Sequence, residues 1–152
     1  MDIASILEAS AERYPEHIAL KFDGREWSYT QWLERTRRFA QALADLGVRP
    51  GDRVAFYVST SEHSVTTYFG CQLLGAVAVP LNFRLSPGEV TFILQDSGAR
   101  VLVYGRYLAD NAGKALARVR SVHDAISCAY DTADLPDGHL HFDTLVDSTE
   151  DR

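Results

Sequence analysis

Histidine and cysteine are the side chains in this sequence that most readily act as bases, nucleophiles or metal ligands. Cys71 and Cys128 have no cysteine or histidine at the spacing of a metal site, and two cysteines do not make a disulfide framework. We expect Cys71 to pack inside a helix. The histidines that we considered as bases or ligands lack a third ligand, so we interpret them as surface residues: His63, His123, His139 and His141.

Two short stretches have residue types that suit anion binding. Ser59, Thr60 and Ser61 precede a predicted helix, where backbone N–H groups can hold a phosphate, although helix capping explains the same residues. Lys114 and Arg118 are one helical turn apart and would form a basic patch, although a solvated helix face explains them equally well. The residues alone leave both alternatives open.

The elements that must position these residues are predicted by the alternation of apolar strands and helical segments, which is typical of βαβ units on a parallel sheet. We therefore predict an α/β fold, a parallel sheet of about four strands with flanking helices, preceded by a small antiparallel hairpin around Asp23 and Gly24. The predicted strands are 18–22, 26–28, 53–58, 77–81, 100–104 and 125–130. The predicted helices are 3–14, 28–46, 59–74, 86–97 and 106–120.

Three of these helices begin with the spacing of a capping box, in which a serine precedes a glutamate or glutamine by three residues. The pairs are Ser28 with Gln31, Ser59 with Glu62, and Ser86 with Glu89. Glycines at the other ends, Gly47 and Gly75, suit the left-handed residue that closes a helix. Residues 1–130 are therefore predicted to form one α/β unit, and 131–152 a linker or surface excursion in which Phe142, Leu145 and Val146 can dock back on the body.

Composition limits the classes of partner. The chain has 152 residues, one domain's worth, and a net charge of −6, which argues against a nucleic-acid surface. The first residues include Asp2 and Glu8 and lack a signal-peptide core, so we expect a cytoplasmic protein. The uncharged run 64–83 is interrupted by Gly75 and Pro80, which excludes a transmembrane helix there.

Four ordered blocks of this sequence resemble the N-terminal part of AMP-forming acyl-CoA synthetases, members of the acyl-adenylate superfamily. The blocks are YTQWL at 29–33, GVRPGDRV at 47–54, LGAVAVPLNFRL at 74–85 and DSGAR at 96–100. The resemblance covers most of the chain and is weak after Tyr104. It implies a parent enzyme that uses ATP and Mg²⁺ to convert a carboxylic acid to an acyl-adenylate and then transfers the acyl group to the thiol of coenzyme A.

The family's motifs for adenylation are absent from this sequence. They are a Ser/Thr/Gly-rich loop ending in Pro-Lys-Gly, a Thr-Gly-Asp segment, and a lysine on a mobile C-terminal domain, whereas the lysines here are Lys21 and Lys114. The resemblance therefore predicts the front end of such an enzyme, inactive by itself, with no tightly bound ligand. The block after the Val-Pro-Leu strand is more similar to fatty-acyl and aryl-CoA ligases than to peptide-synthetase domains.

The resemblance also implies contacts with coenzyme A. In relatives, the loop after the Val-Pro-Leu strand lies near the nucleotide of coenzyme A, and here that loop holds Asn82, Phe83 and Arg84. Arg84 is the candidate phosphate contact, Phe83 the candidate adenine contact, and Lys114 a further basic candidate. Alternatively, Asn82 caps the loop and Arg84 pairs with Glu89.

Two other functions remain open from the sequence. A stand-alone non-catalytic module would associate with a protein or bind coenzyme A without turnover, and a flavodoxin-like nucleotide binder would need its phosphate loop at 59–61. A complete module covers its own core, whereas a fragment leaves an apolar sheet face exposed, through which we expect homo-oligomers.

Overall fold

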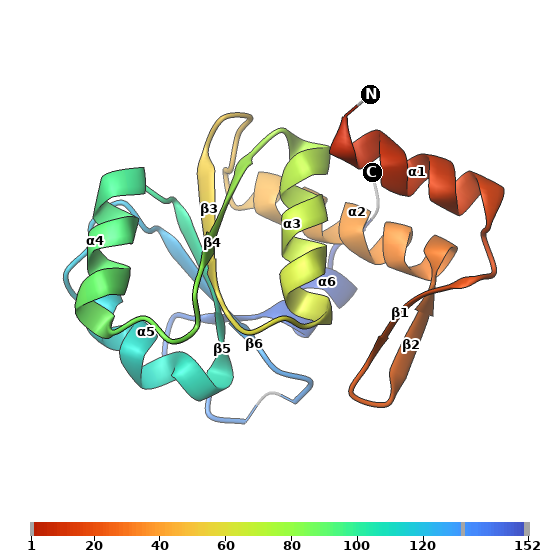
Figure 1. Ribbon diagram of the computed structural model, residues 1–152. Helices are drawn as coiled ribbons and strands as arrows, with labels where there is room; N and C mark the ends of the chain where they lie inside the picture. The colour runs from red at the N-terminus through yellow and green to blue at the C-terminus, as the bar shows by residue number, and fades with distance from the viewer. Residues whose placement is uncertain (1, 132, 151–152) are drawn as a thin grey trace.

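A parallel sheet forms the centre of the chain in a computed structural model that describes residues 2–131 and 133–150 (Figure 1). Its five strands lie in the order β4-β3-β5-β6-β7, and a separate antiparallel pair is formed by β1 and β2. The strands are β1 (Ile18–Phe22), β2 (Arg25–Ser28), β3 (Arg53–Tyr57), β4 (Val77–Leu81), β5 (Val101–Gly105), β6 (Asp124–Cys128) and β7 (Leu140–His141). The predicted α/β class, with a parallel sheet and an N-terminal hairpin, is confirmed.

Helices cover both faces of this sheet. They are α1 (Ile3–Arg13), α2 (Tyr29–Asp45), α3 (Glu62–Leu74), α4 (Pro87–Ser97), α5 (Ala109–Leu116) and α6 (Phe142–Asp147), with a 3₁₀ turn at Arg106–Leu108. In Figure 1, α4 and α5 lie on one side of the strands and α2, α3 and α6 on the other. The predicted helix 106–120 is therefore two shorter elements, because the chain enters it through the 3₁₀ turn.

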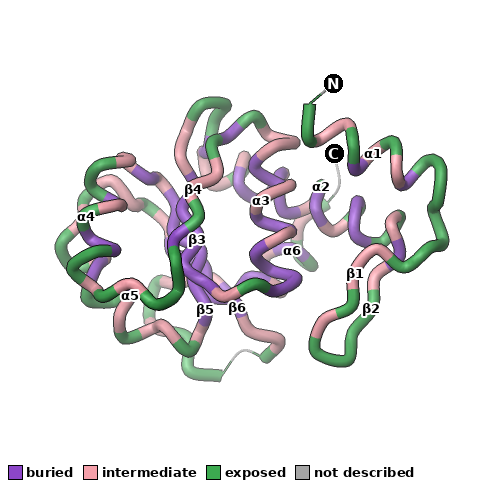
Figure 2. Tube along the Cα trace, in the orientation of Figure 1, coloured by how far each residue is buried: buried purple, intermediate pink, exposed green. Residues whose placement is uncertain are grey.

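Each sheet face carries its own apolar core. One core joins Val54 and Phe56 of β3 with Phe39 of α2 and Cys71 of α3, and the other joins Ala55 and Tyr57 of β3 with α4 and α5. Because successive strand residues point to opposite faces, a strand covered on both sides must be apolar throughout. Strands β3, β5 and β6 are accordingly among the most continuously buried parts of the chain in Figure 2, whereas the edge strand β4 is more exposed.

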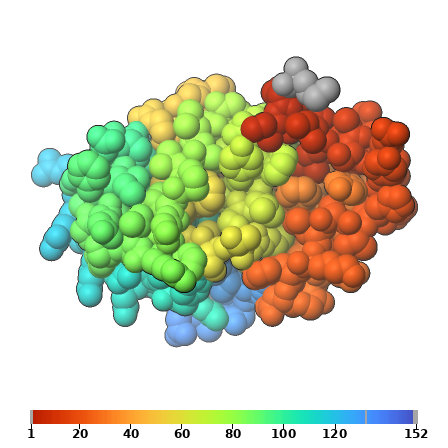
Figure 3. Space-filling view, in the orientation of Figure 1, coloured from red at the N-terminus to blue at the C-terminus, as the bar shows by residue number. Residues whose placement is uncertain are grey.

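The N-terminal elements pack beside the sheet, against α2 and α3. Leu7 and Ala11 of α1 contact Trp32 and Leu33 of α2 in a third apolar cluster. The space-filling view shows the N-terminal elements, in red and orange, along one side of the molecule (Figure 3). The hairpin turns through Asp23 and Gly24, at φ 50° and 72°, as the type I′ chemistry of this pair predicts.

The capping prediction is correct for two helices and wrong for α3. Ser28 with Gln31 and Ser86 with Glu89 form the expected boxes. At α3 the cap is Ser61, whose partner is Ser64, and Glu62 is the first helical residue. The Glu62 side chain is buried against Arg35 and does not reach back to a cap N–H, so Ser59 has no capping role.

The segment after β6 contributes to the sheet and its core. Leu140 and His141 of β7 pair in parallel with β6, and α6 follows directly. Phe142 and Val146 are almost completely buried against α2 and the sheet, in agreement with the expected docking. The division at residue 130 stays a prediction, and Thr132, Asp151 and Arg152 of that segment lie outside the described residues.

Candidate functional site

The carboxyl edge of the sheet is the candidate site, because the connections change direction there. From β3 the chain crosses through α3 to β4 on one side, and from β4 through α4 to β5 on the other side of β3. In open α/β sheets, ligands bind outside the carboxyl ends of the strands at such a switch point. The segments that leave β3, β4 and β5 at this edge contain Ser59–Ser61, Asn82–Arg84 and Arg106–Tyr107.

The loop that holds Asn82, Phe83 and Arg84, called here the Asn82 loop, follows β4 directly. The Asn82 side-chain oxygen accepts a hydrogen bond of 2.9 Å from the backbone N–H of Arg84, so Asn82 shapes the loop. The Arg84 guanidinium lies 5.5 Å from the centre of the Phe83 ring. All three residues are exposed.

Arg84 pairs with no carboxylate among the residues that the structure describes, and its side chain donates no hydrogen bond to them. The alternative pairing with Glu89 is wrong, because the Glu89 carboxylate accepts a hydrogen bond of 2.7 Å from the Ser86 N–H. A guanidinium without a carboxylate partner keeps its donors available for an external anion. The structure therefore leaves Arg84 chemically suited to a phosphate contact.

A hollow of about 330 Å³ lies next to the Asn82 loop, between the ends of β3 and β4 and the start of α3. Its walls are mainly apolar and include three polar side chains. The lining residues are Phe56, Val58, Thr60, Ser64, Pro80, Leu81, Asn82 and Phe83. Two of the predicted contact residues, Asn82 and Phe83, thus line one cavity, and the Arg84 guanidinium lies over the ring of Phe83.

Lys114 is exposed on α5, and no contact within the described residues joins it to the Asn82 loop. Its neighbour in the predicted patch, Arg118, accepts a hydrogen bond of 3.0 Å from Gln95 through its backbone oxygen. The structure brings Asn82, Phe83 and Arg84 together but does not add Lys114 to them.

A buried ionic cluster lies under the start of α3 and was missed at the sequence level. Arg35 of α2 pairs with Glu62 of α3 and, at 2.6 Å, with Asp143 of α6. Tyr130 donates to Glu62 at 3.3 Å, and Thr66 donates to Glu62 at 2.8 Å. We call Arg35, Glu62, His63, Tyr130 and Asp143 the buried cluster.

The pKa shifts of this cluster follow from its pairing. Burial alone would lower the pKa of Arg35, but the carboxylates of Glu62 and Asp143 outweigh that effect and hold it above its ordinary value. Burial alone would raise the pKa of Asp143, but hydrogen bonds from His63 and Arg35 hold it below its ordinary value. The cluster therefore contains a charged guanidinium and an ionised aspartate at neutral pH.

The prediction that the histidines are surface residues is correct for His123 and wrong for His63 and His141. His63 is only 4% exposed, and its Nε2 lies 3.1 Å from the Asp143 carboxylate. His141 is also buried, and its Nδ1 accepts a hydrogen bond from Thr144 at the start of α6. His139, which is half-buried, bonds the Tyr104 hydroxyl at 2.7 Å. The sequence gives no spacing that pairs His63 with a residue eighty positions later.

The cysteines are buried, as predicted for Cys71, and both thiols are poor nucleophiles. Burial raises the pKa of Cys71 to about 12. Burial also raises the pKa of Cys128, and the Glu62 carboxylate raises it further. Among the described residues, no group of three histidine, cysteine or acidic side chains is placed to hold a metal ion.

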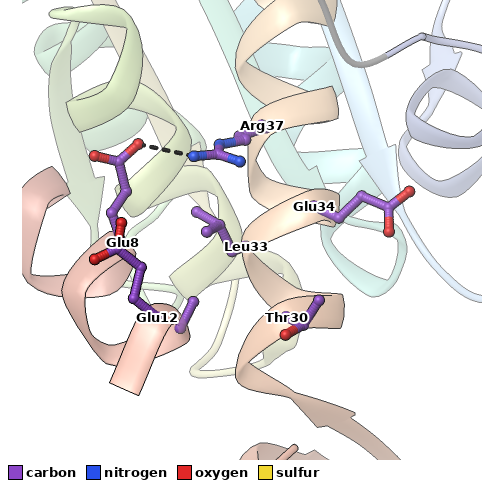
Figure 4. Close-up of a pocket in the computed structure, with 7 residues that line it drawn as sticks. Glu8, Glu12, Thr30, Leu33, Glu34 and Arg37 are labelled. Atoms are coloured by element: carbon purple, nitrogen blue, oxygen red, sulfur yellow. Dashed lines mark hydrogen bonds and ion pairs between the residues drawn. The ribbon is translucent and has the colours of Figure 1, made fainter. Parts of the chain in front are cut away.

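A larger groove of about 530 Å³ lies between α1 and α2, away from the carboxyl edge. Figure 4 shows Glu8 and Glu12 on one wall and Thr30, Leu33, Glu34 and Arg37 on the other. Arg37 is paired with Glu8 at 3.1 Å, so the groove offers carboxylates and no free guanidinium. It does not suit a phosphate ligand, and we place the candidate site at the Asn82 loop.

Curated relatives of this chain are ligases that act on carboxylic acids. It is 43% identical over 103 residues to the fatty acid–[acyl-carrier-protein] ligase ScoC of Streptomyces coeruleorubidus, covering 68% of this chain and 19% of the relative. It is 42% identical over 94 residues to a feruloyl-CoA synthase of Amycolatopsis, covering 62% of this chain and 19% of that relative. The chain thus spans about a fifth of the length of these relatives.

Solved structures of ligases share the fold. The anthranilate CoA ligase AuaEII, in complex with anthranoyl-AMP, matches with a TM-score of 0.93 and 26% identity over 100% of this chain and 29% of that one. The N-terminal domain of FACL13 from Mycobacterium tuberculosis matches with a TM-score of 0.87 and 30% identity. The match covers 100% of this chain and 37% of that one. No helix among the described residues has the length and apolarity needed to cross a bilayer.

Residues 7–150, nearly the whole sequence, match the family described as AMP-binding enzyme. The same stretch contains the strand and loop blocks that surround the Asn82 loop. The chain therefore belongs to the AMP-binding enzyme family.

Proposed function

We propose that this chain supplies the N-terminal part of an AMP-forming acyl-CoA ligase and that its Asn82 loop contacts the nucleotide of coenzyme A. The reaction of such a ligase joins a carboxylate to ATP, releasing pyrophosphate, and then exchanges AMP for the coenzyme A thiol. The names of the relatives support a fatty or aryl acid as the substrate class. A cytoplasmic location is part of the same proposal.

The observation that carries this proposal is the Arg84 guanidinium, which has no carboxylate partner within the described residues and lies over the ring of Phe83, a residue that lines the cavity. A guanidinium binds phosphate oxygens with two parallel N–H donors, and Phe83 offers a face against which a purine can lie. Asn82 holds the backbone of Arg84 and so fixes the direction from which its side chain leaves the loop. Lys114 would act as a longer-range positive charge, with a smaller effect.

Adenylation is assigned to no residue of this chain. The described residues gather no metal-binding group, and the sequence has no Pro-Lys-Gly loop or Thr-Gly-Asp segment to hold ATP and Mg²⁺. We propose that the chain alone does not adenylate an acid. Pyrophosphate exchange with ATP, Mg²⁺ and benzoate or decanoate is expected to stay at background, and exchange above background would contradict this.

Isothermal titration with coenzyme A and, separately, with ATP and Mg²⁺ tests the binding proposal. We expect the chain to bind coenzyme A and not ATP, and Arg84→Ala to weaken coenzyme A binding about tenfold. Arg120→Ala, which removes another exposed arginine, is the matched control and is expected to leave the affinity unchanged. Equal losses in the two variants, or no binding of coenzyme A, would refute the role of Arg84.

A stand-alone module that binds coenzyme A without turnover is the second candidate. The observation that favours it is the cover of helices on both sheet faces, which leaves β3 and β5 buried (Figure 2). Homo-oligomers through an exposed sheet face stay a prediction. Sedimentation at increasing protein concentration tests it, because a covered core predicts a monomer and an open sheet face predicts association.

A further inference from the structure

A second cavity lies at the carboxyl edge of the sheet, between the ends of β3, β5 and β6. It has a volume of about 300 Å³, which is large enough for a small ring compound. We call it the edge pocket. Its lining residues are Phe22, Asp23, Val58, Ser59, Ser61, His63, Arg106, Tyr107, Cys128, Ala129, Tyr130 and Asp131.

The walls of the edge pocket are held in place by neighbouring elements. Tyr107 accepts a hydrogen bond of 2.7 Å from the Ser59 N–H, which ties the segment after β5 to the segment after β3. The Tyr107 ring packs over Gly105, where an added Cβ would lie 2.5 Å from the ring. On the other side of the pocket, the centre of the Tyr130 ring lies 4.7 Å from the centre of the His63 ring.

His63 lines this pocket and has one ring nitrogen without a hydrogen-bond partner within the described residues. Its Nε2 lies 3.1 Å from the Asp143 carboxylate, which is ionised and can only accept a hydrogen bond, so Nε2 carries the hydrogen. In the neutral ring, Nδ1 is then an acceptor. Nδ1 has no hydrogen-bond partner within the described residues, and His63 is one of the residues that line the pocket.

The charges around the edge pocket disfavour an anion. Its lining contains two carboxylates, Asp23 and Asp131, and one guanidinium, Arg106. Arg106 is already bonded to Asp131 and to the backbone oxygen of Ala133, and Arg25 lies 4.0 Å over the Tyr130 ring. A neutral ligand therefore fits this pocket better than a phosphate or a carboxylate.

We propose that the edge pocket binds a small neutral aromatic ring, which donates an O–H or N–H hydrogen bond to Nδ1 of His63. The aromatic walls contact the ring, Asp143 fixes the orientation of His63, and Arg35 compensates the charge of Asp143. This site is separate from the Asn82 loop, and the inference does not rest on coenzyme A binding.

The test uses phenol, toluene and benzoate as probes of the full chain, with His63 observed through its side-chain nitrogen resonances. Phenol is expected to shift the Nδ1 resonance and to bind about tenfold more tightly than toluene, which has the same shape without the donor. Benzoate is expected to bind more weakly than phenol. Equal binding of phenol and toluene, an unchanged Nδ1 resonance, or preferred binding of benzoate would each overturn the proposal.

Two variants locate the binding. His63→Gln keeps an N–H for Asp143 and removes Nδ1, so it is expected to abolish the preference for phenol over toluene. Ala129→Leu fills the pocket and leaves the hydrogen bond between His63 and Asp143 in place. It is expected to weaken the binding of phenol and of toluene at least tenfold. Unchanged phenol binding in Ala129→Leu would place the probe elsewhere and refute the site. Arg84→Ala is expected to leave phenol binding unchanged.

Discussion

Arg35 and Arg84 show two different uses of arginine in one fold. The Arg35 guanidinium is buried, with 13% of its side chain exposed, and it holds the carboxylates of Glu62 and Asp143 on two other helices. Arg84 stands on an exposed loop, where its guanidinium faces an aromatic ring and no carboxylate within the described residues.

This difference separates a structural role from a binding role. A buried charge that loses its partner is costly, so Arg35 is fixed by the carboxylates that surround it. An exposed arginine contributes little to stability and remains available to a ligand. Replacing Arg35 should therefore affect folding, and replacing Arg84 should affect binding.

The largest expected effect is that of Arg35→Ala. The substitution leaves Glu62 and Asp143 buried without a guanidinium, and we expect the free energy of unfolding to fall by about 4 kcal/mol. Urea denaturation followed by circular dichroism measures it. Arg37→Ala, which breaks the exposed pair with Glu8, is the control and should change the free energy by less than about 0.5 kcal/mol. Equal effects would show that the cluster is not what stabilises α3 and α6.

Asp143→Asn comes next, and its effect should depend on pH. The pKa of Asp143 is lower in the folded chain than its ordinary value of 3.8, so the ionised form stabilises the fold above that value. We expect a loss of about 2 kcal/mol at pH 7. The difference from the unsubstituted chain should shrink as the pH falls below 3.8, where the unfolded chain takes up the proton, and should be lost below the lower pKa of Asp143 in the folded chain.

Denaturation curves at pH 7, 5 and 3 check this dependence. A difference that stays constant from pH 7 to pH 3 would mean that the Asp143 charge has no role in the buried cluster.

A smaller effect is expected at the start of α3, which presents Glu62 and His63 to the cluster. Ser61→Ala removes the cap of α3 and should lower the free energy of unfolding by about 1 kcal/mol. Ser59→Ala is expected to change it by less than about 0.5 kcal/mol, since Ser59 takes part through its backbone N–H. If Ser59→Ala lowered the free energy of unfolding more than Ser61→Ala, Ser59 would be the cap of α3, as the sequence spacing predicts.

A change in stability as small as those of the control variants is expected of Arg84→Ala. The free energy of unfolding should shift by less than about 0.5 kcal/mol, because the guanidinium is exposed and contacts only the Phe83 ring within the described residues. Thermal unfolding without ligand measures it. If Arg84→Ala lowered the free energy of unfolding as much as Arg35→Ala, Arg84 would have a structural role like that of Arg35.

The elements that the sequence predicts well are those with a local periodic pattern. Residues 54–58 form a near-continuous apolar run, as expected of a strand between two helical layers, and β3 occupies this place. Trp32 and Phe39 predict the buried stripe of α2. The Asn82 loop could be placed because it follows directly from a strand with a clear end.

The buried cluster depends on contacts between residues far apart in the sequence, which no local pattern reports. One signal was present: Arg35 is three residues after Trp32 and four before Phe39, within the apolar stripe of α2. A charge at such a position requires a buried partner, but the sequence alone does not name Glu62 or Asp143. The same limit applies to α3, where Glu62 pairs with Arg35 inside the cluster and the cap is Ser61, not Ser59.

The most direct test of the binding role of Arg84 compares coenzyme A with pantetheine, which has the thiol arm without the nucleotide. Calorimetric affinities of both ligands for the chain and for Arg84→Ala isolate the contribution of the phosphates. We predict that the chain prefers coenzyme A and that Arg84→Ala reduces this preference about tenfold while leaving pantetheine binding unchanged. A preference that is the same in both proteins would contradict the assignment of Arg84 to the coenzyme A phosphates.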